Sequence, residues 1–399
     1  MGVNHIKVWL VIISCAIILI FAPSVSGAVN NEQEFNRDEI INGQLDKLDL
    51  MEMERFINDL NRETNALIPD FNLRQFILQV TRGGEPFNVS VLVAGLLQYL
   101  FKELLANSRL LGQLLILAVV AAILQNIQRA FADETIGKMA YGVCFLVLLT
   151  LAIQTFAISI DTGKIAIDRM VTFMQALLPV LLALLTAVGG IATAAIFHPL
   201  LVMVITVMAT LIKILIFPLI YIGVVLSIIS HIAPGVSITR LAGLLHEWSV
   251  ILLGLVICIF MGVLVVQGVT ASVSDGISMR AVKFLTGTFV PIVGKMFVDA
   301  IDAIAGCSLL LKNAIGVLGV IAVFLVCAFP LLKLTSLILI YKVTAAIIQP
   351  ISEEGLVRCI NSLANSLTVV LVTVATVGVM FFITITVVIG VGNMTVMLR

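Results

Sequence analysis

The chain has 399 residues, of which 61% are hydrophobic and 12% are charged, and its formal net charge is +0. A soluble globular domain is about 45–50% apolar and about 25% charged, so this composition excludes an ordinary soluble protein and predicts a helical membrane protein. The sequence contains no block of basic residues, which argues against a nucleic-acid-binding protein.

The N-terminus has the features of a secretion signal. Lys7 supplies a weak positive charge, and residues 8–22 form an apolar stretch that Pro23 ends. The small residues at 26–28 are typical of a signal-peptidase site. We therefore predict a cleaved signal peptide over residues 1–28, with an uncleaved anchor helix as the alternative.

An acidic region follows over residues 29–90, with twelve acidic and six basic side chains. Apolar residues at helical spacing predict an amphipathic helix over about 46–62 and a second short helix after Pro69. The side chains expected to face inward are Leu48, Met51, Phe56 and Leu60 in the first helix, and Leu73, Phe76, Ile77 and Val80 in the second. Because two short helices bury little core alone, we expect this extracytoplasmic region to pack on the membrane domain or on a partner.

Residues 91–399 form the predicted transmembrane domain. The helix expected over residues 89–105 is either a short span or an interfacial helix, and we favour the interfacial one. Crossing a hydrocarbon core of ~30 Å takes about 20 helical residues. Windows of suitable length and polarity are 110–127, 139–159, 171–191, 200–230, 249–270, 308–330 and 362–391.

Three stretches of this domain depart from a plain span. The 200–230 window contains Lys213 and Pro218 and is expected to be kinked or broken. Residues 284–305 and 331–348 are candidates for re-entrant segments. We therefore predict an all-α polytopic membrane protein with about seven spans, to within two, and a small helical N-terminal region.

A charged face lies in an otherwise apolar part of the chain. Lys295, Asp299 and Asp302 are spaced i, i+4, i+7 and therefore share one face of a helix. Ionisable groups at membrane depth cost several kcal/mol unless they are paired or hydrated, so they indicate a functional region. Asp302 then needs a basic group from another segment, and Lys312 and Lys213 are the candidates. The alternative is an internally neutralised, purely structural ion pair.

Catalytic and metal-binding patterns are missing from the sequence. The six cysteines are mostly isolated in apolar stretches without a CxxC motif, and His246-Glu247 lacks the second histidine of a zincin motif. We therefore expect no enzyme, no metal and no cofactor. The glycines Gly316 and Gly319 are expected to allow close helix packing.

Several short motifs resemble the stage III sporulation protein AE family. They are Val266-Gln267-Gly268, Asp275-Gly276, Lys283-Phe284, Pro291–Gly294, Asp299–Asp302, the string GCSLLLKNA over Gly306–Ala314, Tyr341–Ala346 and Gln349-Pro350. The resemblance covers roughly residues 90–399. It marks Gln267, Asp275, Lys283, Gly306, Asn313, Gln349 and Pro350 as family-motif positions. Where the family pattern has an aspartate after Gln349-Pro350, this chain has Ser352-Glu353-Glu354.

The resemblance implies a non-enzymatic, multi-span subunit of the secretion-like channel apparatus that joins mother cell and forespore and supports spore development after engulfment. It implies a location in the mother-cell membrane around the forespore. The implied partners are other stage III sporulation proteins, including a ring-forming component and a cytoplasmic ATPase. The alternative function is a stand-alone secondary transporter that uses Lys213 and the charged face; an intramembrane enzyme is the least favoured.

Overall fold

The structure is a computed structural model that describes residues 34–46, 48, 50–63, 73–82, 89–130, 134–232, 238–289, 293–352 and 354–397. Every regular element within these residues is a helix, as the composition predicts. The signal peptide predicted over residues 1–28 lies outside them.

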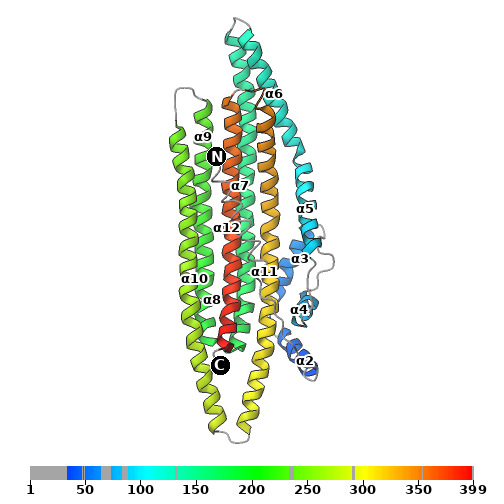
Figure 1. The fold of residues 1–399 in the computed structure, drawn as a ribbon, viewed down its shortest axis with the longest axis vertical. Helices are drawn as coiled ribbons and strands as arrows, with labels where there is room; N and C mark the ends of the chain where they lie inside the picture. Colours follow the sequence, from blue (N-terminus) through cyan, green and yellow to red (C-terminus); the bar gives the residue numbers. More distant parts are fainter. Residues whose placement is uncertain are drawn as a thin grey trace.

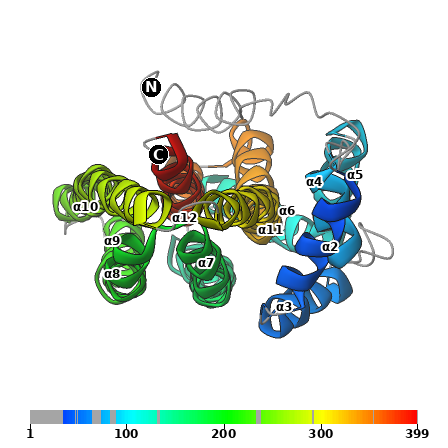
Figure 2. The ribbon, with the colours of Figure 1, turned by 90° about the horizontal axis from the view of Figure 1, so that it is seen from below.

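The body of the molecule is a bundle of long helices that run along its long axis (Figure 1). The long helices are α7 (Glu134–Ala187), α8 (Ile191–Leu211), α9 (Phe217–Ile232), α10 (Thr239–Phe289), α11 (Val293–Ile348) and α12 (Glu354–Met397). The short π-helix η2 (Ile212–Ile216) joins α8 to α9. Helix α12 packs against α7, α9, α10 and α11, with α10 and α11 on either side of it (Figure 2). Apolar residues recur every three or four positions along α12, and the series Leu363, Leu367, Val370 and Val374 is at most 1% exposed.

Within the described residues, five helical segments are long and apolar enough to cross a membrane. The candidate spans are Leu146–Ala187, Ile191–Ser230, Thr239–Gln267, Ala300–Ile348 and Glu354–Asn393. A sixth candidate is the pair Val93–Ala106 and Ser108–Ile123, which is bent by 43°. The described residues thus hold five or six candidate spans, within the range expected from the sequence.

Two boundaries differ from those expected. The windows 139–159 and 171–191 belong to the single helix α7, because the charged residues between them have ordinary helix propensity and do not end a helix. Residues 331–348 form the continuous end of α11 rather than a separate re-entrant segment. Residues 284–305 hold the end of α10 and the start of α11.

The irregularity expected within residues 200–230 is a π-helical turn in a helical segment that continues as one candidate span, rather than a break. The N–H of Phe217 donates to the carbonyl of Ile212, five residues back, which is the wider turn of a π-helix. Pro218 follows and has no N–H with which to continue the α-helical ladder, so a local widening of the helix accommodates it. Lys213 lies within this turn.

Three short helices, α2 (Glu34–Leu45), α3 (Met51–Glu63) and α4 (Leu73–Thr81), form a small head on one side of the bundle (Figure 2). Helices α2 and α4 pack on α11, and α3 packs on α7. At the second contact the rings of Phe56 and Phe173 lie 4.9 Å apart. The expectation that this region packs on the membrane domain is therefore confirmed.

The inward faces of the head helices were predicted with mixed success. In α4, Leu73, Phe76 and Ile77 are buried, as expected. In α3 the buried residues are Met53 and Ile57, whereas Met51 is 57% exposed. Leu48 and Phe56 are partly buried and pack against the core, so among the described side chains the predicted stripe was wrong only at Met51. Helix α2 was not predicted.

Helices α5 (Val89–Ala106) and α6 (Ser108–Ala130) connect the head to the bundle. Helix α5 packs along α11, where the ring of Tyr99 meets that of Phe329 edge-on with centroids 4.9 Å apart. An interfacial position for α5 stays a prediction.

Candidate functional site

The charged face predicted on α11 is only partly within the described residues. Lys295, Asp299 and Asp302 all fall in α11, which keeps them on one helical face, but the side chains of the first two lie outside the described part. The Asp302 side chain is exposed. Lys312 lies about 15 Å further along the same helix and roughly a quarter-turn away from Asp302. Lys312 therefore does not belong to this face.

Lys312 is instead sealed inside the bundle. Its side chain is 0% exposed, and its Nζ donates a hydrogen bond of 2.9 Å to the carbonyl oxygen of Ile389 on α12. A Cβ atom on Gly392 would overlap this Nζ, so the absent side chain of Gly392 makes the space for the ammonium group. Among the described residues Lys312 forms no ion pair. A backbone carbonyl is its one hydrogen-bond acceptor in this part of the structure.

Glycines bring α11 close to its neighbours near this lysine. A Cβ on Gly316 would overlap the Ile389 side chain of α12, and one on Gly319 would lie 2.5 Å from Leu177 of α7. The close packing expected at these two glycines is confirmed. It brings the α12 backbone within reach of Lys312.

The string Gly306–Ala314 also touches the head. Ser308 is fully buried; it donates to the Ile304 carbonyl and accepts a 2.8 Å hydrogen bond from Gln44 Nε2 of α2. Cys307 is buried, whereas Gly306 is exposed with nothing within 4 Å of a built Cβ. This string therefore joins three parts of the molecule: α11, α12 and the head.

Two buried amide oxygens belong to residues next in the sequence to Lys312 and to Gly392. They are Oδ1 of Asn313 on α11 and Oδ1 of Asn393 on α12, and neither has a hydrogen-bond partner among the described residues. Most buried polar atoms in proteins are hydrogen-bonded, so these oxygens mark a polar spot in an apolar bundle.

The other family-motif positions are spread along the molecule. Gln267 is partly buried in α10, and Asp275 and Lys283 follow it in the same helix with side chains outside the described part. Gln349 and Pro350 are exposed in the turn between α11 and α12, roughly 54 Å along α11 from Asn313. The structure does not bring these positions together.

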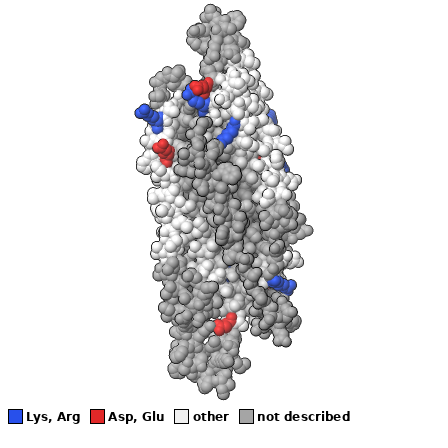
Figure 3. Space-filling view, viewed as in Figure 1, with Lys and Arg blue, Asp and Glu red and all other residues white. Residues whose placement is uncertain are grey.

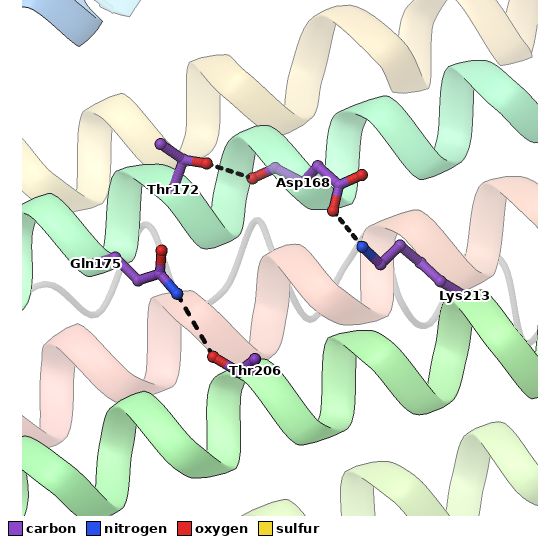
Figure 4. A network of polar contacts seen from close by, with 5 residues as sticks. All are labelled: Asp168, Thr172, Gln175, Thr206 and Lys213. Atoms are coloured by element: carbon purple, nitrogen blue, oxygen red, sulfur yellow. Dashed lines mark hydrogen bonds and ion pairs between the residues drawn. The ribbon is translucent and has the colours of Figure 1, made fainter.

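A second polar site lies between α7 and α8, continuing into η2 (Figure 4). We call it the α7–α8 seam, and it consists of Asp168, Thr172, Gln175, Thr206 and Lys213. Lys213 Nζ forms an ion pair with Asp168 Oδ1, with side-chain exposures of 28% and 56%. Gln175 Nε2 donates to Thr206 Oγ1 at 3.5 Å, and Thr172 Oγ1 donates to the Asp168 carbonyl at 3.0 Å.

The seam lies at the middle of two candidate spans. Asp168 is near the centre of Leu146–Ala187, and Lys213 is near the centre of Ile191–Ser230. The sequence reasoning missed Asp168 because the charges around it resemble a loop between two spans. It also proposed Lys213 as a partner of Asp302. The structure corrects this, since Lys213 pairs with Asp168 and Lys312 bonds to α12.

The described residues contain no group of three or more His, Cys, Asp or Glu side chains that could hold a metal ion. The polar chemistry of the described bundle includes the Asp168–Lys213 ion pair on its outside, the sealed ammonium group of Lys312 and hydroxyls that mostly donate to carbonyls of their own helices. Such an arrangement can hold helices together and can attract other polar groups.

Comparisons with known proteins agree on one family. A family model described as stage III sporulation protein AE matches residues 71–392. A protein named stage III sporulation protein AE from Bacillus subtilis (strain 168) is 37% identical over 395 residues, which is 98% of this chain and 99% of that protein. No solved structure matches the chain.

Proposed function

This chain belongs to the stage III sporulation protein AE family and has a role in sporulation, and on that premise we propose that it is a non-enzymatic membrane subunit of the channel apparatus between mother cell and forespore. Its partners are then other stage III sporulation proteins, among them a ring-forming component and a cytoplasmic ATPase. It acts in the mother-cell membrane that surrounds the forespore and serves spore development after engulfment.

The observation that carries this proposal is the length of the apolar outer surface. Exposed large hydrophobic side chains run from Ile191 to Ile229 along α8, η2 and α9. At 1.5 Å per residue this surface is about 57 Å long, nearly twice the ~30 Å hydrocarbon core of a bilayer. Even a tilt of about 40° would bring only about 39 Å of helix into the core.

Protein must therefore cover the rest of that surface, because a large exposed apolar patch marks an interaction site. A stand-alone transporter is surrounded only by lipid and water, so it would have no protein to cover the apolar surface that extends beyond the hydrocarbon core. The long apolar helices thus support a subunit of a larger assembly.

The proposal includes a topology. Residues 1–28 are a cleaved signal peptide, residues 29–90 lie outside the cytoplasm, and residues 91–399 form the membrane domain. The mature chain then begins near Val29. N-terminal sequencing of the membrane-extracted protein tests this, and recovery of Met1 would contradict it.

The main experiment is purification of a C-terminally tagged chain from sporulating cells in mild detergent. We expect the ring-forming component and the ATPase to be recovered with it, and a preparation that carries an unrelated tagged membrane protein is the control. We also expect deletion of the gene to stop spore development after engulfment and to leave vegetative growth unchanged. A chain that is recovered alone and transports a solute in vesicles would support the transporter instead.

A further inference from the structure

The α7–α8 seam places a charged pair on the outside of an apolar bundle. The described surface in the space-filling view is almost free of charge, and the few charged side chains lie mainly toward its upper end (Figure 3). Asp168 is nevertheless 56% exposed in the middle of a candidate span. Lipid tails cannot solvate an exposed carboxylate, so the seam needs a polar cover.

The seam has a polar centre with apolar margins. Ile165 on α7 is 53% exposed, and Met203 and Ile214 beside the seam on α8 and η2 are 66% and 71% exposed. Within a membrane, such margins suit a protein contact that encloses the polar groups and keeps lipid outside.

The two helices of the seam form an antiparallel hairpin. They join at Gly189, whose φ of 99° lies in the left-handed region that glycine adopts without strain, and Gly190. The hairpin places Asp168 beside Lys213 at one depth and Gln175 beside Thr206 at another (Figure 4). At each depth, one group lies on α7 and its complement on the facing segment, Thr206 on α8 and Lys213 on η2.

We propose that a second copy of this chain packs on the seam, related to the first by a two-fold axis parallel to the helices. Such an axis preserves depth and exchanges the two sides of the seam. Asp168 of each copy then faces Lys213 of the other, and Gln175 of each faces Thr206 of the other. The two ion pairs close into a ring of alternating charges, which is the self-complementarity that a two-fold contact requires.

The second copy is favoured over another protein because the seam already contains its own complement. A different partner would have to supply a matching acid and base at the same depth. The inference needs only that the bundle lies in a membrane and does not depend on the channel apparatus, so it can be tested without any sporulation partner.

The test uses two full-length copies with different tags, expressed together in a host without sporulation genes and extracted in mild detergent. One copy carries Asp168→Lys and the other Lys213→Asp. Each variant alone forms a homotypic pair with four like charges, whereas the mixture restores both cross-copy ion pairs. Because apposed like charges cost several kcal/mol, we expect the mixture to be recovered about tenfold more than either homotypic pair.

The head supplies a matched control. Asp46, directly after α2, and Arg74 of α4 form an exposed ion pair of 2.9 Å in the head, away from the seam. Copies with Asp46→Lys and Arg74→Asp should show no preference for mixed pairs. The double variant Asp168→Lys/Lys213→Asp should associate with itself as the parent does.

A second measurement covers the possibility that single charge reversals do not accumulate. Copies with Gln175→Cys and with Thr206→Cys, expressed together, should form an oxidant-dependent dimer that the parent does not form. Failure of two parent copies to be recovered together, equal recovery of mixed and homotypic charge variants, or no cross-copy disulfide would overturn the proposal.

Discussion

Lys213 and Lys312 both lie in apolar helical segments, yet they differ in burial and in the partner of the ammonium group. Lys213 is on the outer surface, partly exposed, and paired with the Asp168 carboxylate. Lys312 is inside, fully buried, and bonded to the Ile389 carbonyl beside Gly392. The first arrangement leaves a charge pair available to another molecule, whereas the second depends on the shape of the protein around it.

This difference separates two kinds of mutational effect. Changes at the seam should alter association between molecules and leave the single bundle intact. Changes around Lys312 should alter the bundle itself, because a buried ammonium that loses its acceptor has no access to water. The following variants test that separation, from the largest expected effect to the smallest.

Gly392→Ala should have the largest effect. Its new Cβ would occupy the position of the Lys312 Nζ and push the ammonium away from the Ile389 carbonyl. A charge displaced into apolar surroundings costs about 3 kcal/mol, so we expect roughly a hundredfold shift toward the misfolded chain. The amount of folded protein in isolated membranes, measured by size-exclusion of the tagged chain, tests this.

The matched control is Gly390→Ala, two residues away on the same helix, where a built Cβ meets nothing within 4 Å. It should accumulate as the parent does. If both alanine variants accumulate normally, Lys312 is not held in the way the structure shows.

Removing the charge should relieve that defect. In the double variant Lys312→Met/Gly392→Ala the flexible, apolar methionine can move aside without leaving a charge unpaired. We expect membrane abundance to return to within about twofold of the parent, since the charge carries the several kcal/mol cost. Spore counts then distinguish the roles of the lysine: normal sporulation in the rescued variant would make Lys312 purely structural.

The charged face on α11 should respond more weakly. Asp302 is exposed, so Asp302→Asn should leave membrane abundance unchanged while reducing spore formation more than Asp299→Asn does. Removing an exposed charge lowers the free energy of unfolding by at most about 0.5 kcal/mol. A loss of spore formation without a loss of membrane abundance would therefore point to a contact between Asp302 and a partner. Normal sporulation of both variants would remove this face from the functional part of the protein.

Local chemistry predicted the helical membrane class and several details of the fold. Pro218 predicted a helix irregularity, which is the π-helical turn η2, and Gly316 and Gly319 predicted close helix packing. The burial of Leu73, Phe76 and Ile77 followed from helical periodicity. Each of these features depends on residues close together in the sequence.

The partners of the buried and paired charges could not be predicted in the same way. Asp168 meets Lys213 only because the α7–α8 hairpin fixes the register of two helices, 45 residues apart in the chain. Lys312 meets Ile389 across 77 residues, where the close packing of α11 on α12 decides the contact. Three-dimensional register, rather than composition or spacing, selects these partners. The sequence identified both lysines but offered them as partners for Asp302, which has no basic partner at helical spacing once Lys295 is paired with Asp299.

The last expected effect concerns the contact between the head and α11, where Gln44 donates to Ser308 at 2.8 Å. Both partners are uncharged, so the bond should contribute about 1 kcal/mol, well below the effect of displacing Lys312. Gln44→Ala, Ser308→Ala and the double variant form a cycle that isolates this coupling in reversible unfolding in mixed detergent micelles. Gln44 Nε2 and Ser308 Oγ both also donate to the Ile304 carbonyl, at 3.5 and 2.8 Å, so each single variant removes a second bond that the double-variant cycle separates from the coupling. Asn42→Ala, on the same head helix, is the control and should show no coupling to Ser308. A coupling near zero between Gln44 and Ser308 would mean that the head is held by apolar contacts such as that of Phe56 with Phe173, and that this hydrogen bond adds nothing to its docking.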